Sequence, residues 1–203
     1  PFLTVNDSLL NRKFVKNYPV PIILGIEEYL DGPLLSYINE IGYVAFGFES
    51  GQHTEMASIE NHVAFIYYSL TLAGSIEKEK IDTKRYYNLL LKRTRNIRSI
   101  YEIYFRHAIN EGDEFIMEPN FDNFQRVTKR QKIATSNGHR LYAKKKGRIF
   151  MPLYQAKGDD GFFAIRRIRS IYLVLSTIFR QLHVDVIMPL LPGVKWASDK
   201  RDI

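Results

Sequence analysis

The chain has 203 residues, of which 45% are hydrophobic and 25% charged, the composition of a globular protein long enough for one or two domains. Cysteine is absent, which excludes disulfides, thiol catalysis and zinc sites with cysteine ligands. The net charge of +7 would suit an anionic partner, but no RNA-binding signature, zinc finger or basic helical arm accompanies it. The composition therefore favours a solvated basic surface over nucleic-acid binding.

The sequence predicts no membrane segment. No apolar run reaches the ~20 residues of a membrane span, and the nearest approach, 168–191, is interrupted by charged residues and Pro189. No signal peptide is visible, so we expect a cytoplasmic protein without a membrane partner. Because the first residue is Pro1 rather than Met, we also expect a segment upstream of it.

The amino-terminal part has an α/β pattern. Residues 1–20 are mixed, and we expect them to be irregular or the tail of an element that lies upstream. A short buried strand is predicted over 20–26, a helix opened by Asp31 follows, and a second strand covers 43–48. The strand–helix–strand order predicts that the two strands form a parallel pair.

Two further helices are predicted in the next 40 or so residues. The first begins at residue 54 or 58 and ends near residue 72. One face of this helix is apolar at helical spacing and is lined by Ile59, Val63, Ile66 and Leu70. The second is opened by Asp82 and ends near Arg93.

The pattern changes near Ile97. A long strand over 97–109 and short strands separated by turns such as 136–138 predict a compact all-β module. A helix over 170–182 and an apolar tail over 184–194, packed against the core, follow. We therefore expect two domains: residues 1–96, part of an α/β sheet domain, and residues 97–203, a β-domain with a carboxy-terminal helix and tail.

One candidate for chemistry stands out. The apolar run 44–48 ends in Glu49, and Ser50, Gly51, Gln52 and His53 follow at once. In open α/β sheets, ligands bind at the carboxyl ends of the strands, where a carboxylate can transfer protons. The alternative is an ordinary solvated glutamate at the end of a strand.

Five segments in this order resemble the succinylglutamate desuccinylase/aspartoacylase family across nearly the whole chain. They are 18–35, 48–53, 134–138, 149–155 and 158–163. The resemblance implies a partial zinc-carboxypeptidase-like α/β sheet domain followed by a compact β-domain with a carboxy-terminal helix. It also implies that the amino-terminal portion of the family fold is missing from this chain.

The resemblance implies zinc-dependent hydrolysis of the amide bond of N-acyl amino acids. Glu49 then matches the glutamate that takes a proton from water and delivers it to the leaving amine. The family's zinc motif is a His with a Glu three residues later, plus a distant second His, and no His here has a Glu at that spacing. We therefore expect the zinc ligands upstream of Pro1, no metal ligand in this chain, and no activity from this chain alone.

Three other residues are candidates for substrate binding. Gln52 and His53 follow Glu49 closely enough to line its pocket, although His53 would equally cap the next helix. Tyr154, just past a β-domain strand, is either a phenol donor in the cleft or a structural tyrosine. The substrate-binding Arg of the aspartoacylase branch has no counterpart in 34–48, where Asn39 lies near its place, so an acyl-aspartate substrate is not favoured.

Two other classes of function stay open. The first is a non-enzymatic relative that binds a small carboxylate or a partner protein, and a His-x-x-Glu motif upstream of Pro1 would argue against it. The second is a basic nucleic-acid-binding module, which requires polynucleotide binding that weakens steeply with salt. The sequence specifies neither the acyl group nor the amino acid, and it leaves a homo-oligomer open.

Overall fold

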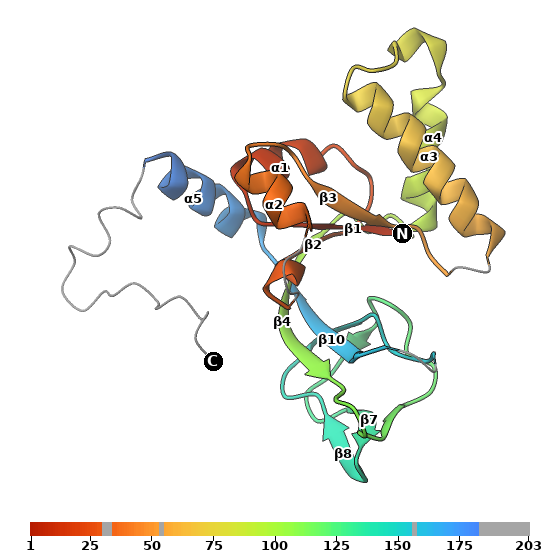
Figure 1. Cartoon of the computed structure of the whole chain (residues 1–203), viewed down its shortest axis with the longest axis vertical. Helices are drawn as coiled ribbons and strands as arrows, with labels where there is room; N and C mark the ends of the chain where they lie inside the picture. The colour runs from red at the N-terminus through yellow and green to blue at the C-terminus, as the bar shows by residue number, and fades with distance from the viewer. Residues whose placement is uncertain (30–33, 53–54, 156–157, 183–203) are drawn as a thin grey trace. The chain divides into compact units, whose positions relative to one another are not determined.

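The computed structural model describes residues 1–29, 34–52, 55–155 and 158–182. The chain divides into two compact units, Pro1–Arg167 and Ile168–Ile203. The first unit holds a seven-stranded mixed sheet, a three-stranded antiparallel sheet and four α-helices (Figure 1). The second unit contains α5 (Ser170–Gln181), at the predicted position. The predicted α/β class is confirmed.

The large sheet has the strand order β3-β1-β2-β4-β10-β9-β6. Its parallel strands are β1 (Phe2–Val5), β2 (Ile22–Leu24) and β4 (Ile100–Ala108). The strands antiparallel to their neighbours are β3 (Phe46–Glu49), β10 (Asp160–Arg167), β9 (Gly147–Phe150) and β6 (Arg126–Val127). The parallel strands therefore occupy the middle of the sheet, and β3 is an edge strand.

The prediction that residues 1–20 are irregular is wrong, and so is the predicted parallel pair. Residues 1–20 contain β1 and α1 (Leu9–Val15), and β1 lies between β2 and β3. Leu3 and Val5 are fully buried, so this four-residue strand forms part of the core. Since β1 lies between β2 and β3, these two strands do not pair with each other, and they run in opposite directions.

A buried amide network ties α1 to the approach to β3. Asn11 is 0% exposed, and its side chain donates to Asn39 Oδ1 at 2.8 Å while accepting from the Ala45 backbone N–H at 3.2 Å. Asn39, on α2 (Leu34–Glu40), donates in turn to the carbonyl oxygen of Tyr43 at 2.8 Å. Asn39 therefore supports the entry to β3, because both ends of its amide are engaged by the protein.

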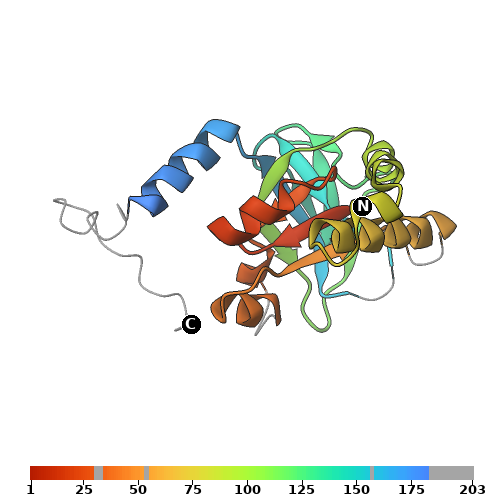
Figure 2. The ribbon, with the colours of Figure 1, turned by 90° about the horizontal axis from the view of Figure 1, so that it is seen from above.

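Helices α3 (Met56–Leu72) and α4 (Thr83–Arg93) form where they were predicted and lie side by side (Figure 1, Figure 2). Asp82 caps α4 by accepting from the Arg85 backbone N–H at 2.9 Å. The apolar face of α3 that the sequence predicts is exposed. The buried residues are instead Ser58, Asn61, Ala64, Tyr68 and Thr71.

Polar side chains can face the core on α3 because they find hydrogen-bond partners there. Tyr68 donates to the carbonyl oxygen of Asn17 at 2.9 Å, and Asn61 donates to that of Ser50 at 2.7 Å. Thr71 donates to the helix itself, at the carbonyl oxygen of Tyr67. Burial of polar groups costs little when each group keeps a hydrogen bond.

The large sheet runs through the predicted domain boundary. Strand β4 begins just after residue 97 and pairs with β2, while β10 and β9 continue the same sheet. One core cluster joins both regions and consists of Phe2, Ile23, Tyr101, Phe150, Phe163 and Ile165. The division at residue 97 stays a prediction, although strands from both sides of it share one sheet.

The small sheet contains β5 (Phe115–Met117), β7 (Lys132–Ser136) and β8 (His139–Tyr142). Its hairpin turns at Asn137 and Gly138, with φ of +49° and +75°, as the Ser-Asn-Gly signal predicts. Figure 1 shows this hairpin at the opposite end of the first unit from α3 and α4.

Some predictions fall outside the described residues, namely the helix cap at Asp31 and the apolar tail over 184–194. The 3-10 helices are η1 (Ile26–Tyr29) and η2 (Lys78–Lys80). In the ranges that the structure covers, no helix combines the length and apolarity needed to cross a membrane.

Candidate functional site

Glu49 is the last residue of β3, and its side chain is exposed. It pairs with Phe2 at the start of β1. Glu49 therefore lies at the edge of the sheet where the parallel strands begin, because β3 runs antiparallel to β1.

The loop after Glu49 is fastened to the first turns of α3. Ser50 is buried, and its carbonyl oxygen accepts from Asn61, as noted above. Ser58 Oγ donates to the carbonyl oxygen of Gln52 at 2.7 Å. Gly51 has φ of +133°, and a Cβ there would lie 2.7 Å from Ser58 Oγ, so the loop requires glycine at this position. These contacts fix the path of the chain as it leaves β3.

The two faces of β3 have different surroundings. Phe48 stacks on Phe65 of α3 at 4.0 Å, and Phe46 contacts Phe14 of α1 at 5.7 Å. Glu49 alternates with Phe48, so it projects from the opposite face, the one that also carries Phe2. Glu49 is therefore on the face that α3 does not cover.

Loops from the β-rich part border that face. The Phe2 ring contacts Phe150 at 4.8 Å and Phe124 at 5.8 Å. The backbone N–H of Met151 donates to Asn123 Oδ1 at 3.1 Å, which links the loops that contain Phe124 and Met151. Phe124 and Met151 have φ of +68° and +49°. Such conformations are rare for bulky residues and concentrate at functional sites.

Tyr154 belongs to the same pair of loops. Its hydroxyl donates to the carbonyl oxygen of Glu118 at 2.8 Å and accepts from the Phe121 backbone N–H at 2.7 Å. Its side chain is nevertheless 52% exposed. Tyr154 therefore joins the two loops through its hydroxyl, while one side of the ring remains accessible.

The predicted site residues come together only in part. Glu49 and the exposed Gln52 share one short loop, whereas His53 lies outside the described residues. Three residues near Glu49 were not predicted from the sequence, namely Phe2, Ser58 and Asn61. A signal for the last two exists, since two polar residues three apart on a predicted helix can lie on one buried side.

The described residues do not form a zinc site. Across those ranges, no three His, Asp or Glu side chains converge so that they could hold a metal ion. His62 lies edge-on to Phe48 at 5.6 Å, as expected for a structural histidine on the helix. A catalytic zinc needs three protein ligands, so the residues present do not fit the metal that the resemblance implies.

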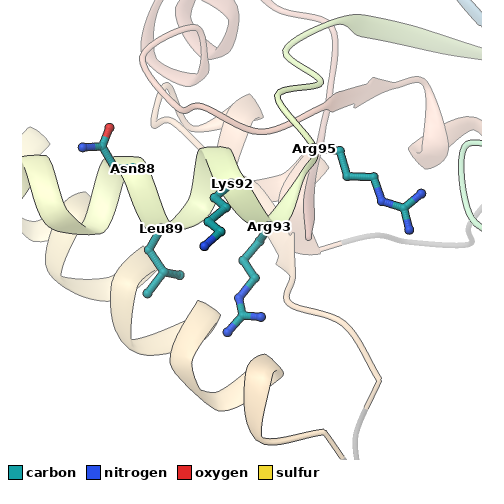
Figure 3. Close-up of a pocket in the computed structure, with 5 residues that line it drawn as sticks. All are labelled: Asn88, Leu89, Lys92, Arg93 and Arg95. Carbon is teal, nitrogen blue, oxygen red and sulfur yellow. The ribbon is translucent and has the colours of Figure 1, made fainter.

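A basic hollow lies elsewhere, at the carboxyl end of α4. Its volume is about 590 Å³, and its lining residues are Asn88, Leu89, Lys92, Arg93 and Arg95 (Figure 3). Arg93 pairs with Glu60 of α3 at 2.5 Å. Cations are favourable at the negative end of a helix dipole, which accounts for this cluster without a ligand. None of the predicted site residues lines the hollow.

No protein-family model matches the sequence, and no curated protein is significantly similar to it. Solved structures do match: the fold is that of succinylglutamate desuccinylases. The structure of succinylglutamate desuccinylase from Vibrio parahaemolyticus matches 83% of this chain with a TM-score of 0.50 and 12% identity. The Vibrio cholerae enzyme gives the same three values. At this identity the similarity establishes the fold, and the expected likeness to the desuccinylase fold is confirmed.

A third structure, the ectoine utilization protein EutE (DoeB) from Ruegeria pomeroyi, matches 83% of this chain and 55% of its own, with 13% identity and a TM-score of 0.45. The match covers 49% of each Vibrio enzyme. The chain therefore spans about half the length of the solved desuccinylases that it matches.

Proposed function

We propose that the protein to which this chain belongs hydrolyses the amide bond of N-acyl amino acids, with Glu49 as the residue that accepts the proton of the attacking water. The observation that supports this proposal is the position of Glu49. It is an exposed carboxylate at a strand end, held by a loop fastened to α3 and bordered by two strained loops.

The chemistry follows from what a carboxylate can do at such a place. An amide carbonyl needs water deprotonated as it attacks and a proton supplied to the departing amine, and one carboxylate can perform both transfers in turn. Because the Glu49 side chain is exposed and lies on the face of β3 that α3 does not cover, a substrate can approach it. The exposed Gln52 lies close by and would hydrogen-bond the polar groups of the substrate.

Zinc enters this proposal only through residues outside the chain. The described residues do not fit a zinc site, so we assign no step to the metal here. The start of β1 lies beside Glu49, and residues that precede Pro1 in a longer gene product would therefore emerge near it. We propose that the zinc ligands are among those residues.

The nucleic-acid alternative has less support, because several basic residues are already engaged. Arg166 pairs with Glu102 at 2.6 Å, and Arg106 pairs with Asp160. Lys145 Nζ lies 4.1 Å from the centre of the Tyr104 ring, a cation–π contact. These charges bind neighbouring side chains on the protein surface, as expected for a solvated basic face.

The test is Glu49→Gln in the longer gene product, assayed on a panel of N-acyl amino acids that varies the acyl group and the amino acid. Glutamine keeps the shape but cannot accept the proton, so kcat should fall by about 10²–10⁴-fold. Glu55→Gln is the matched control, because Glu55 is an exposed carboxylate six positions on whose side chain makes no capping hydrogen bond. Equal effects of the two substitutions would contradict the proposal. They would favour the alternative, a non-enzymatic relative that binds a small carboxylate or a partner protein.

A further inference from the structure

The segment that holds most of the small sheet is strongly basic. From residue 123 to residue 155 the sequence contains nine lysine and arginine residues and no Asp or Glu. The net charge of the whole chain is +7, so the residues outside this segment sum to −2. The positive charge of the protein is therefore concentrated in one part of the sequence.

Two loops of this segment lie side by side. Lys129 and Arg130 occupy the two central positions of the turn over 128–131, which a backbone hydrogen bond of 3.2 Å closes. The Arg130 N–H donates to the carbonyl oxygen of Ala143 at 2.8 Å, so the second loop, which begins just after Ala143, adjoins the first. The exposed basic residues of the two loops, which we call the basic loop pair, are Lys129, Arg130, Lys144, Lys145 and Lys146.

The charges of the basic loop pair are not neutralised by the described residues. Lys144 Nζ lies 5.4 Å from the centre of the Phe105 ring, and Lys145 Nζ lies 4.1 Å from that of Tyr104. Such contacts hold an ammonium group in place without cancelling its charge. The ion pair in this region belongs to a neighbour, Lys132, which pairs with Glu118. Like charges on adjacent loops repel one another, and an anionic partner would relieve this repulsion.

The basic loop pair adjoins a sheet face with exposed apolar side chains. Ile116 pairs with Thr135, which pairs with Arg140 on its other side, so these three side chains share the outer face of the small sheet. Tyr142 lies two positions after Arg140 and therefore projects from the same face. Ile116 is 68% exposed and Tyr142 is 49% exposed. The surface thus combines basic loops with an aliphatic and an aromatic side chain.

We propose that the basic loop pair, together with the outer face of the small sheet, binds the surface of a membrane that contains anionic phospholipids. Each basic side chain near such a surface strengthens binding by about five-fold. Tyrosine rings favour the boundary between headgroups and acyl chains, and an aliphatic side chain such as Ile116 gains by leaving water there. The surface carries both kinds of group that a peripheral membrane contact uses.

The composition of the surface favours lipid over nucleic acid. All the residues of the basic loop pair except Arg130 are lysines, whereas arginine is the preferred residue for recognition of nucleic acids. A phosphate backbone would also leave Ile116 in water. The sequence-based expectation of no membrane partner depends on spanning segments and signal peptides, and a surface contact requires neither.

The first experiment measures sedimentation of the 203-residue chain with vesicles of phosphatidylcholine alone and of phosphatidylcholine mixed with phosphatidylserine. The protein should bind the mixed vesicles and not the neutral ones. Raising the salt from about 0.1 M to about 1 M shortens the screening length from about 10 Å to about 3 Å, so the bound fraction should fall steeply. Equal binding to both kinds of vesicle, or binding to neither, would overturn the proposal.

The second experiment removes charge from the surface and, as a matched control, from α4. The triple substitution Lys144→Gln, Lys145→Gln and Lys146→Gln should weaken vesicle binding by on the order of 100-fold. The control changes three exposed basic residues of α4, which Figure 1 shows at the opposite end of the first unit from β8. They are Lys84, Arg85 and Lys92, each changed to Gln. The control lowers the net charge equally and should keep most of the binding, so equal losses would contradict a specific surface.

A second variant guards against loss of folding, because Lys145 packs on Tyr104. Lys129→Gln combined with Lys146→Gln removes two side chains that form no ion pair or ring contact with a described residue. The double variant should keep its melting temperature and bind the mixed vesicles about 25-fold more weakly. Unchanged binding would place the contact elsewhere on the protein and overturn the proposal.

The last experiment offers other anions to the same surface, namely a single-stranded oligonucleotide and a polyglutamate peptide. If either probe binds, the double variant weakens that binding, and the mixed vesicles do not bind, the surface belongs to nucleic acid or to an acidic protein and the proposal fails. The inference does not depend on the proposed activity. Glu49→Gln should therefore bind the mixed vesicles as the unmodified protein does, so either idea can fail while the other stands.

Discussion

Glu49 and Tyr154 differ in whether hydrogen bonds from the protein hold their side chains. Glu49 accepts no hydrogen bond from a described residue that would fix its carboxylate, so its role depends on where β3 ends. Tyr154 has both hydrogen-bonding capacities of its hydroxyl engaged by backbone groups of Glu118 and Phe121. Its hydroxyl therefore holds the two loops beside the Glu49 face together.

We predict that Tyr154→Phe lowers the free energy of unfolding by about 1–3 kcal/mol, because the Phe121 N–H loses its acceptor and the Glu118 carbonyl loses a donor. Urea unfolding of the 203-residue chain measures this loss. Tyr142→Phe is a suitable control, because Tyr142 is also half-exposed. In the longer protein, Tyr154→Phe should lower kcat/KM only to the extent that it displaces the two loops. A large loss of kcat/KM without a loss of stability would show instead that the hydroxyl binds substrate.

His107 makes folding sensitive to acid. Its ring lies against Phe115 and Phe162, and burial lowers its pKa, although the charge of Asp113 opposes the shift. The unfolded chain then binds a proton more readily than the folded one, so stability falls as the pH drops through about 6.5, the unfolded pKa, toward the lower folded value.

We predict that His107→Phe removes this part of the pH dependence and preserves the ring packing. Chemical denaturation at about pH 7.5 and pH 5, on either side of the ordinary histidine pKa, measures the difference for each protein. His139→Phe, at an exposed strand position, is the control and should leave the dependence in place. Parallel pH profiles for His107→Phe and the unmodified protein would contradict the argument.

At the scale of an element, the β3–α3 connection is the part most sensitive to small changes. We predict that Gly51→Ala lowers the free energy of unfolding by about 1–3 kcal/mol, because it adds backbone strain and a Cβ against Ser58 Oγ. Gly112→Ala shares a positive φ but has open space around it, so it should cost less. Equal losses in urea titrations would show that the contact with Ser58 is unimportant.

Elements with strong local signals were predictable from the sequence. The Asp82 cap marks the start of α4, and the Ser-Asn-Gly turn marks the β7–β8 hairpin, since both depend on neighbouring residues alone. β1 was missed because four residues give no usable period, and its burial comes from strands distant in sequence. The buried side of α3 was not predicted, because it carries polar side chains whose partners, the carbonyl oxygens of Asn17 and Ser50, come from other parts of the chain.

The candidate site, too, could be predicted only where its signal is local in the sequence. Glu49 was found because an apolar run ends there, which is a local signal. The residues that border the Glu49 face of β3 are Phe2, Phe124 and Met151. They come from three distant parts of the chain. Their meeting depends on sheet order, which the sequence did not specify.

At the scale of the whole molecule, the question is whether this chain carries a metal by itself. No trio of potential ligands converges in the parts that the structure describes, and no histidine in the sequence has a glutamate three residues later. We predict that the purified 203-residue chain retains no stoichiometric zinc after dialysis, as measured by elemental analysis. If the gene encodes residues before Pro1, we expect the longer product to retain one zinc, because those residues would supply three ligands. One tightly held zinc per short chain, lost on His62→Ala, would overturn this prediction and place the metal on α3. A longer protein that also lacks zinc would argue for a relative of the desuccinylases that binds without hydrolysis.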